Sequence, residues 1–277
     1  MKDYHIHSGL LDHTEDNLES IIAAADNIGF KEIAITEHFI WPLITYPKPI
    51  SEKDHDTLFP DKSLIPKDGR KTTDLNTYFR YIETLQKKFQ VRILKGLEVD
   101  YFAEYENEIK KCIMKYKIDI ILGSCHYVYD SALPQSNKYI HINLGQLQPF
   151  IDKYGEQKLY SVYFENILAA TKSGMFNYIA HLDFLKRKFK NYNFGKAIIY
   201  IRPILKELIK NNIGLEINLS GIKDVGETYP SMDVINEYIK MGGKKLSIGS
   251  DAHSVSRMKK SVYLIQDFEK NFKEFLS

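Results

Sequence analysis

The chain has 277 residues, of which 44% are hydrophobic and 27% are charged, as in a soluble globular protein with a sizeable core. Its 38 basic and 36 acidic residues give a net charge of +2, so the overall charge favours neither nucleic acid nor a membrane surface as a partner. Two cysteines exclude a disulfide framework, and we expect no signal peptide and no membrane span, hence a cytoplasmic protein.

Short β-branched runs alternate with longer helical patterns along the chain, which predicts βα units around a parallel sheet. Helix stops are clear, for example Gly29 and the pair Gly242-Gly243. The predicted strands are Asp3–His7, Glu32–Thr36, Val91–Val99, Ile118–Gly123, Asn177–Ala180, Gly214–Asn218 and Lys245–Ile248. The predicted helices are Asp16–Ile28, Thr73–Phe89, Glu104–Lys115, a long one ending near Ser173, Lys196–Lys210, Met232–Met241 and Arg257–Phe275.

About seven βα units follow one another without a convincing linker, which predicts one α/β domain over residues 1–277, organised as a barrel. Two stretches interrupt the rhythm, Phe39–Lys71 and Tyr127–Leu147. Each follows a predicted strand, so we expect two long loops on the same rim of the barrel. Loops of this length often carry function.

Histidines and carboxylates gather at the ends of the predicted strands. In a parallel barrel these carboxyl ends meet on one rim, where active sites are built. Seven of the nine histidines fall there, while His55 and His141 lie in the two long loops. The rim residues are His5, His7, His13, His38, Glu98, His126, His181, Asp251 and His253.

These residue types suit a metal centre. His5 and His7 are two residues apart in a strand, so both imidazoles can face the barrel mouth. Histidine combined with carboxylate suits Zn, Mn or Fe. Taken singly, each residue has a simpler explanation: a lone histidine is more often hydrogen-bonded than a ligand, and Glu98 could pair with a lysine. Chance placement explains the joint arrangement poorly.

The ordered motifs resemble the polymerase and histidinol phosphatase (PHP) family of metal-dependent phosphoesterases. The matching pieces are His5-Ile6-His7, Glu37-His38, Gly96-Leu97-Glu98, Gly123-Ser124-Cys125-His126, Ala180-His181-Leu182-Asp183 and Gly249-Ser250-Asp251-Ala252-His253. Each piece is weak alone, but the set keeps the family's order over nearly the whole chain. The stretch Gly214–Gly221, followed by Tyr229-Pro230-Ser231, is similar to the stand-alone histidinol-phosphate phosphatases of histidine biosynthesis.

The resemblance implies a distorted TIM-like (β/α)7 barrel of the PHP type that holds two to three divalent metal ions, Zn, Mn or Fe. The ligand sets it implies are His5, His7, Glu98 and Asp251 for one metal, Glu98, His126 and His181 for a second, and His13, His38 and His253 for a third. Glu98 would bridge the first two metals. All nine positions are filled, which argues against a catalytically dead relative.

The activity implied by the resemblance is hydrolysis of L-histidinol phosphate to L-histidinol and phosphate. Adjacent cations suit this reaction, because they lower the pKa of a bridging water and neutralise charge on the phosphoryl oxygens. We therefore expect direct attack by a metal-bridging hydroxide, without a phosphoenzyme. The candidate catalytic residues are Asp183, Asp251 and His253, and either Asp183 or a metal-bound histidine would protonate the leaving oxygen.

Three cationic side chains are candidates for binding the phosphate: Lys186, Arg187 and Lys223. Lys186 and Lys223 stand where the histidinol phosphatases tend to place arginine, and lysine lacks the bidentate geometry of a guanidinium. The alternative, given equal weight, is that they are ordinary surface lysines.

Two other functions remain open for the sequence. One is a phosphoesterase of the same family that acts on nucleotides, oligonucleotide ends or another phosphomonoester. The other is a metal-binding or polymerase-accessory module without catalysis. The near-neutral charge argues mildly against nucleic acid, and the full ligand set argues against loss of catalysis. The expected partner is a small phosphomonoester.

Overall fold

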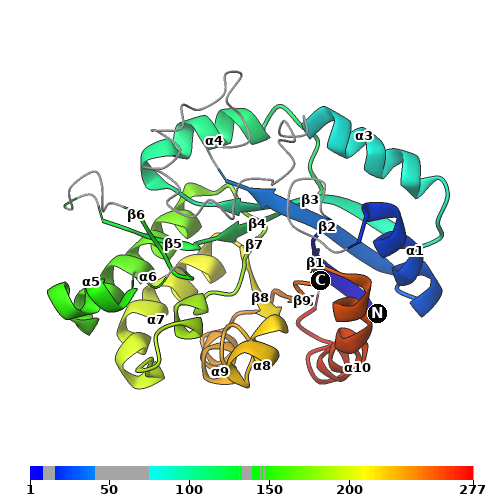
Figure 1. Ribbon diagram of the computed structural model, residues 1–277. Coiled ribbons are helices and arrows are strands. Elements are labelled where there is room, and N and C mark those ends of the chain that lie inside the picture. Colours follow the sequence, from blue (N-terminus) through cyan, green and yellow to red (C-terminus); the bar gives the residue numbers. More distant parts are fainter. Residues whose placement is uncertain are drawn as a thin grey trace.

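The computed structural model describes residues 1–8, 16–40, 75–130, 132, 139–143, 145 and 147–276. Seven strands form one parallel sheet in the order β1-β2-β3-β4-β7-β8-β9. Figure 1 shows this sheet strongly curved, with helices on its outer side. The strand bounds are Lys2–Ile6 (β1), Glu32–Phe39 (β2), Arg92–Asp100 (β3), Ile120–Ser124 (β4), Tyr178–Ile179 (β7), Gly214–Asn218 (β8) and Leu246–Gly249 (β9). The predicted α/β barrel is confirmed.

The helices bury one apolar face against the sheet and expose the other. In α7, for example, Ile201, Ile204 and Leu208 are fully buried at helical spacing. Asn17 and Ser254 cap the helices that follow them by accepting a hydrogen bond from a backbone N–H three residues on. The bounds are Leu18–Ile28 (α1), Leu75–Gln86 (α3), Glu106–Ile113 (α4), Leu147–Tyr154 (α5), Glu156–Ser173 (α6), Phe194–Lys210 (α7), Ser220–Val225 (α8), Met232–Lys240 (α9) and Val255–Asn271 (α10).

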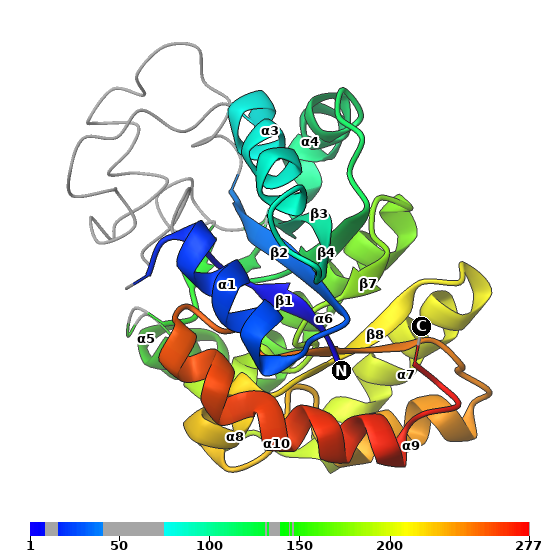
Figure 2. The same cartoon turned by 90° about the vertical axis from the view of Figure 1, so that its right-hand side faces the viewer.

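The first and last strands of the sheet meet at their carboxyl ends. The His7 N–H donates to the Ala252 carbonyl oxygen at 3.0 Å, and the Asp251 N–H donates to the His5 carbonyl oxygen at 2.8 Å. On the outside, α10 lies beside α1, as Figure 2 shows. The sheet is therefore nearly closed into a barrel, and its closure brings the first and last motifs of the chain together.

A β-bulge in β1 sets the direction of the first histidines. Asp3 pairs with Ile33 but Ile6 pairs with Ile35, so β1 carries one extra residue between these pairs. Tyr4 packs inside the barrel, in the cluster that contains Leu122, and the next residue, His5, also points inward to Glu98 and Glu216. The bulge thus allows two adjacent side chains to face the interior, which a regular strand does not permit.

Asp3 holds the bulge in place. This side chain is fully buried, and its Oδ1 accepts hydrogen bonds from the backbone N–H groups of His5 at 3.2 Å and Ser250 at 2.9 Å. The same carboxylate therefore ties the irregular part of β1 to the residue that follows β9.

The two predicted loops differ in outcome. Residues 127–147 contain two short antiparallel strands, β5 (Tyr127–Tyr129) and β6 (Tyr139–His141), so the expected loop is corrected there to a hairpin. Three-residue strands are too short to give a readable alternation pattern, and this is why the sequence shows only a loop. Of the stretch 39–71, Phe39 ends β2 and residues 41–71 lie outside the described residues.

Three smaller elements were not predicted either: α5, α8 and a 3-10 helix at Phe184–Arg187. Each is eight residues long or shorter, so it leaves little periodic signal. Among the described helices, none combines the length and apolar character needed to cross a membrane.

Candidate metal centre

The carboxyl ends of the strands bring together eight of the nine predicted ligands in overlapping groups. His13, the ninth, lies outside the described residues. The groups whose ligand atoms lie within 4.8 Å of one another are His7, His38 and His253; His5, His7 and Asp251; His5, Glu98 and His181; and His38, Glu98 and His126. One compact cluster at the barrel rim therefore contains residues that lie in or directly after β1, β2, β3, β4 and β7, and residues of the turn after β9.

Four side-chain atoms of this cluster are spaced like the ligands of one metal. The Nε2 atoms of His5 and His7 lie 3.1 Å apart. Glu98 Oε2 lies 3.3 Å from His5 Nε2 and 3.5 Å from His7 Nε2. Asp251 Oδ1 lies 3.9 and 3.3 Å from the same two nitrogens, respectively. Four ligands held about 2.1 Å from a tetrahedral ion lie about 3.4 Å from one another. The spacing fits a divalent cation.

Glu98 can reach two cations at once. Its Oε2 faces His5 and His7, whereas its Oε1 lies 2.7 Å from His181 Nε2 and 3.5 Å from His126 Nε2. The carboxylate is 1% exposed, and Oε2 makes no hydrogen bond of suitable geometry to any described residue, although His38 Nδ1 lies 2.7 Å away. A buried carboxylate oxygen without a hydrogen bond is costly unless a cation satisfies it. The residues present therefore fit bound metal.

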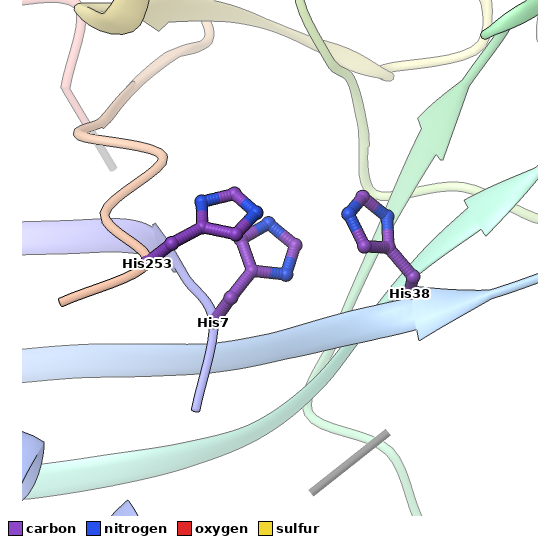
Figure 3. A group of neighbouring side chains, drawn as sticks. All are labelled: His7, His38 and His253. Atoms are coloured by element: carbon purple, nitrogen blue, oxygen red, sulfur yellow. The ribbon is translucent and has the colours of Figure 1, made fainter. Parts of the chain in front are cut away.

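Three imidazoles form the outer part of the cluster. The His7 ring stacks on His253 with centroids 4.2 Å apart, and on His38 with centroids 4.3 Å apart. Figure 3 shows that they come from the end of β1, from β2 and from the turn before α10. His38 Nδ1 also lies 2.7 Å from Glu98 Oε2. His7 and His38 thus each belong to two groups, whereas the sequence assigned each to one metal.

Two buried carboxylates that the sequence analysis did not single out orient these ligands. Asp100 Oδ2 lies 3.0 Å from His126 Nδ1, and its Oδ1 accepts the His126 backbone N–H at 3.0 Å. Glu216 Oε1 lies 2.6 Å from His5 Nδ1. Outer partners of this kind fix the orientation of ligating histidines. Asp100 could have been found, because it lies two residues after Glu98 and so on the same face of β3.

Burial and neighbouring charges shift the pKa values of three of the predicted ligands. Burial works against ionised Glu98, but His38, His5 and His126 outweigh it and hold the pKa of this carboxyl well below its usual range. Burial, helped by His253 and His38, lowers the pKa of His7 to about 3. Burial likewise opposes a charged His5, but Glu216, Glu98 and Asp251 raise its pKa well above the usual value. An ionised Glu98 and a neutral His7 are the protonation states that metal ligation requires, whereas the raised pKa of His5 means that this ring must lose a proton when a metal binds.

The three candidate phosphate-binding residues differ in burial and in their partners. Lys186 is buried, and its Nζ lies 3.0 Å from Asp183 Oδ2, 3.0 Å from Glu227 Oε1 and 2.7 Å from the Thr228 carbonyl oxygen. Arg187 Nε lies 3.1 Å from an oxygen of Asp224 in α8. Lys223, also in α8, is exposed and forms no ion pair with any described residue.

The three candidate catalytic residues also differ in environment. Asp183 is fully buried, and burial raises its pKa to about 6 although Lys186 and the Ser231 N–H favour its ionised form. Asp183 Oδ1 has no hydrogen-bond partner among the described residues. Asp251 Oδ2 accepts the Ser220 hydroxyl at 3.1 Å. His253 Nδ1 lies 3.0 Å from the Asp251 carbonyl oxygen, which fixes its ring.

Comparison with known proteins matches the chain to one family. The family model described as PHP domain matches residues 3–220. A probable histidinol-phosphatase of Clostridium acetobutylicum is 25% identical over 91% of this chain and 86% of its own length. The histidinol-phosphatase of Bacillus subtilis is 25% identical over 91% of this chain and 93% of its own length.

Two solved structures share the fold. A putative histidinol phosphatase from Listeria monocytogenes superposes with a TM-score of 0.77 at 21% identity, covering 95% of this chain and 99% of that one. The histidinol phosphate phosphatase of Lactococcus lactis, solved with zinc, L-histidinol and phosphate, gives 0.69 at 22% identity over 96% and 92% of the two chains.

Proposed function

The chain belongs to the PHP domain family, as its ordered motifs predicted, and on this premise we propose that it is a metal-dependent hydrolase of phosphate monoesters whose substrate is L-histidinol phosphate. The observation that carries this proposal is the spacing of His5, His7, Glu98 and Asp251 around one point. The names of the relatives support the substrate. We place the enzyme, as one domain, in the cytoplasm and in histidine biosynthesis.

The cluster would hold two to three divalent ions, Zn, Mn or Fe, through the nine predicted ligands. Such ions supply an acidified water and offset negative charge on the phosphoryl oxygens. The protein fixes their position through Glu98, which faces two groups of histidines, and through Asp251, which the Ser220 hydroxyl orients. We propose that water attacks phosphorus directly. Acid quenching during turnover should trap no phosphorylated protein, and a covalent phosphoryl-enzyme would contradict direct attack.

Asp183 is the proposed donor of a proton to the leaving oxygen. Its carboxyl is buried, and burial raises its pKa to about 6, so a substantial fraction is protonated in the range where general acids act well. Protonation requires a pH below this pKa, so kcat/KM should fall as pH rises through about 6. Replacing Asp183 with asparagine should remove this limb of the profile and lower kcat on an alkyl phosphate by about 100-fold or more. Steady-state kinetics between pH 5 and 9, as an approximate working range, measure both effects.

Comparing two leaving groups distinguishes a proton-donating role of Asp183 from a structural role. A nitrophenolate leaves without a proton, so the asparagine variant should hydrolyse 4-nitrophenyl phosphate at close to the wild-type rate. Equal losses on the alkyl and aryl esters would show that Asp183 only supports the fold, and histidine ligands such as His253 would then become the candidate donors.

Lys186 and Lys223 should respond differently to the same substitution. Lys186→Met leaves the buried Asp183 carboxylate without its cation, so it should lower the free energy of unfolding by about 3 kcal/mol. Lys223→Met removes an exposed charge and should change stability by less than about 0.5 kcal/mol. If Lys223 contacts the phosphate, its loss should raise KM about tenfold. Denaturant unfolding and steady-state kinetics on both variants test these roles. A Lys186→Met protein of unchanged stability and raised KM would show that Lys186 binds the phosphate and is not needed for the fold.

The substrate proposal is tested by phosphate release from metal-reconstituted protein. The panel should contain L-histidinol phosphate, other amino-alcohol and sugar phosphates, mononucleotides and 5′- or 3′-phosphorylated oligonucleotides. We expect the highest kcat/KM for L-histidinol phosphate. If kcat/KM for another monoester is higher by orders of magnitude, the substrate assignment is wrong but the proposed reaction type stands. If the metal-loaded protein hydrolyses none of these esters, the proposal that it is a phosphate-monoester hydrolase is wrong.

A further inference from the structure

One buried carboxylate outside the predicted ligand set contacts two of the predicted ligands. Glu216 lies in β8 and is 1% exposed. Its Oε1 lies 2.6 Å from His5 Nδ1, and its Oε2 accepts the backbone N–H of His181 at 2.9 Å. His5 lies in β1 and His181 follows β7, so this single side chain links the two flanks of the cluster.

The surrounding backbone leaves room for this side chain and little else. A Cβ atom at Gly249 would lie 2.1 Å from Glu216 Oε1 and 2.5 Å from His5 Cβ, so β9 can approach this closely only with glycine. Asn218 donates from Nδ2 to Glu216 Oε2 at 3.2 Å and so holds the carboxylate in place.

The contact with His181 involves a residue whose backbone conformation is strained. His181 has φ 28°, in the left-handed region that a non-glycine residue seldom adopts. Strained backbone of this kind persists where surrounding interactions hold it. The hydrogen bond from the His181 N–H to Glu216 holds the backbone of this strained residue. The His181 side chain in turn places its Nε2 atom 2.7 Å from Glu98 Oε1.

The contact with His5 decides which ring nitrogen faces the metal position. A carboxylate oxygen only accepts, so the proton of a neutral His5 ring must sit on Nδ1. The lone pair of Nε2 then points at the space between His7 Nε2 and Glu98 Oε2. Glu216 therefore selects the tautomer that can bind a cation there.

We propose that Glu216 is a positioning residue that sets His5 and His181 together, so that one carboxylate controls the affinity of two neighbouring metal positions. This inference rests on the proposed metal centre. Asp100 provides the contrast, because among the described residues of the cluster it forms hydrogen bonds with one ligand, His126.

The test compares Glu216→Gln and Glu216→Ala with Asp100→Asn. Glutamine keeps the size of the side chain, but if its NH₂ faces His5 it turns Nδ1 into an acceptor and moves the ring proton to Nε2. The amide oxygen then still accepts the His181 N–H, so Glu216→Gln should weaken only the zinc-binding step that uses His5. Glu216→Ala removes both contacts and should weaken two zinc-binding steps by about 10- to 100-fold each, whereas Asp100→Asn should weaken one. Competition with a chromophoric chelator resolves the steps. Nitrogen-15 spectra of labelled histidine in zinc-loaded protein should report the change of tautomer, which a purely structural defect would not produce.

Calorimetry on the metal-free proteins shows whether each variant folds. Should Glu216→Ala not fold, Glu216→Asp keeps the charge but is too short to reach both partners, and it should also weaken two steps. Wild-type zinc affinity at both steps in folded Glu216→Ala or Glu216→Asp, or a loss confined to one step in these variants, would overturn the role of Glu216. Failure of the wild-type protein to bind zinc would instead overturn the metal centre.

Discussion

Replacing Glu98 with glutamine is expected to lower kcat/KM for phosphate-ester hydrolysis by more than about 100-fold, since loss of a mere outer partner of a metal ligand already costs about 10- to 100-fold. The two oxygens of Glu98 face the ring nitrogens of different histidines, His5 and His7 on one side and His181 on the other. An amide cannot bridge two cations as a carboxylate does. The purified variant should therefore also lack at least one metal per chain.

Activity and metal content are measured on the same preparations, by phosphate release and by elemental analysis. Glu32→Gln is the matched control, because Glu32 is also a buried carboxylate of the barrel. Glu32 is the first residue of β2, whereas Glu98 in β3 pairs with His38 near the end of β2. The Glu32 side chain is hydrogen-bonded to the Tyr4 hydroxyl and paired with Arg92. The control should keep its metals and its kcat. A fully active Glu98→Gln protein would show that this carboxylate does not bridge metals.

Removal of the metals should abolish hydrolysis and lower the stability of the fold. The cluster concentrates buried carboxylates and imidazoles, and a cation that binds only the folded state stabilises it. At a free metal concentration 100 times Kd this stabilisation is about 2.7 kcal/mol per site. We expect the thermal midpoint to fall after chelation and to recover, together with activity, when Zn, Mn or Fe is returned.

Scanning calorimetry and phosphate release on chelated and reconstituted samples check this expectation. Glu98→Gln should show a smaller response of the midpoint to added metal than the wild-type protein does, which separates binding at the cluster from adventitious binding at surface residues. Full activity in protein shown by elemental analysis to be metal-free would contradict the metal centre.

The sequence predicted the barrel and the residues of its rim well, because both depend on local signals. Strand runs such as Gly214–Asn218 show in the pattern, and parallel topology places their carboxyl ends on one rim. The family match to residues 3–220 agrees with the ordered motifs. The direction of His5 was harder to predict. Alternation gives His5 and His7 one face, but only the bulge after Asp3 makes that face the inner one.

Other features depend on contacts between segments that are far apart in sequence. Lys186 was a candidate for binding the phosphate because it follows His181, yet its ammonium group contacts the Glu227 carboxylate and the Thr228 carbonyl oxygen. Glu216 sits inside a stretch that supported the family resemblance, but its partners His5 and His181 become visible only when the strands are adjacent. Periodicity places a residue on a face of a strand and does not identify its neighbours across the barrel.

Anomalous diffraction from crystals of the zinc-loaded protein tests the metal centre most directly. The proposal predicts a peak between His5 Nε2, His7 Nε2, Glu98 Oε2 and Asp251 Oδ1, about 2.0–2.2 Å from each ligand atom, and a second peak on the Oε1 side of Glu98. Zinc bound only elsewhere on the molecule, with this cluster left without a peak, would contradict it.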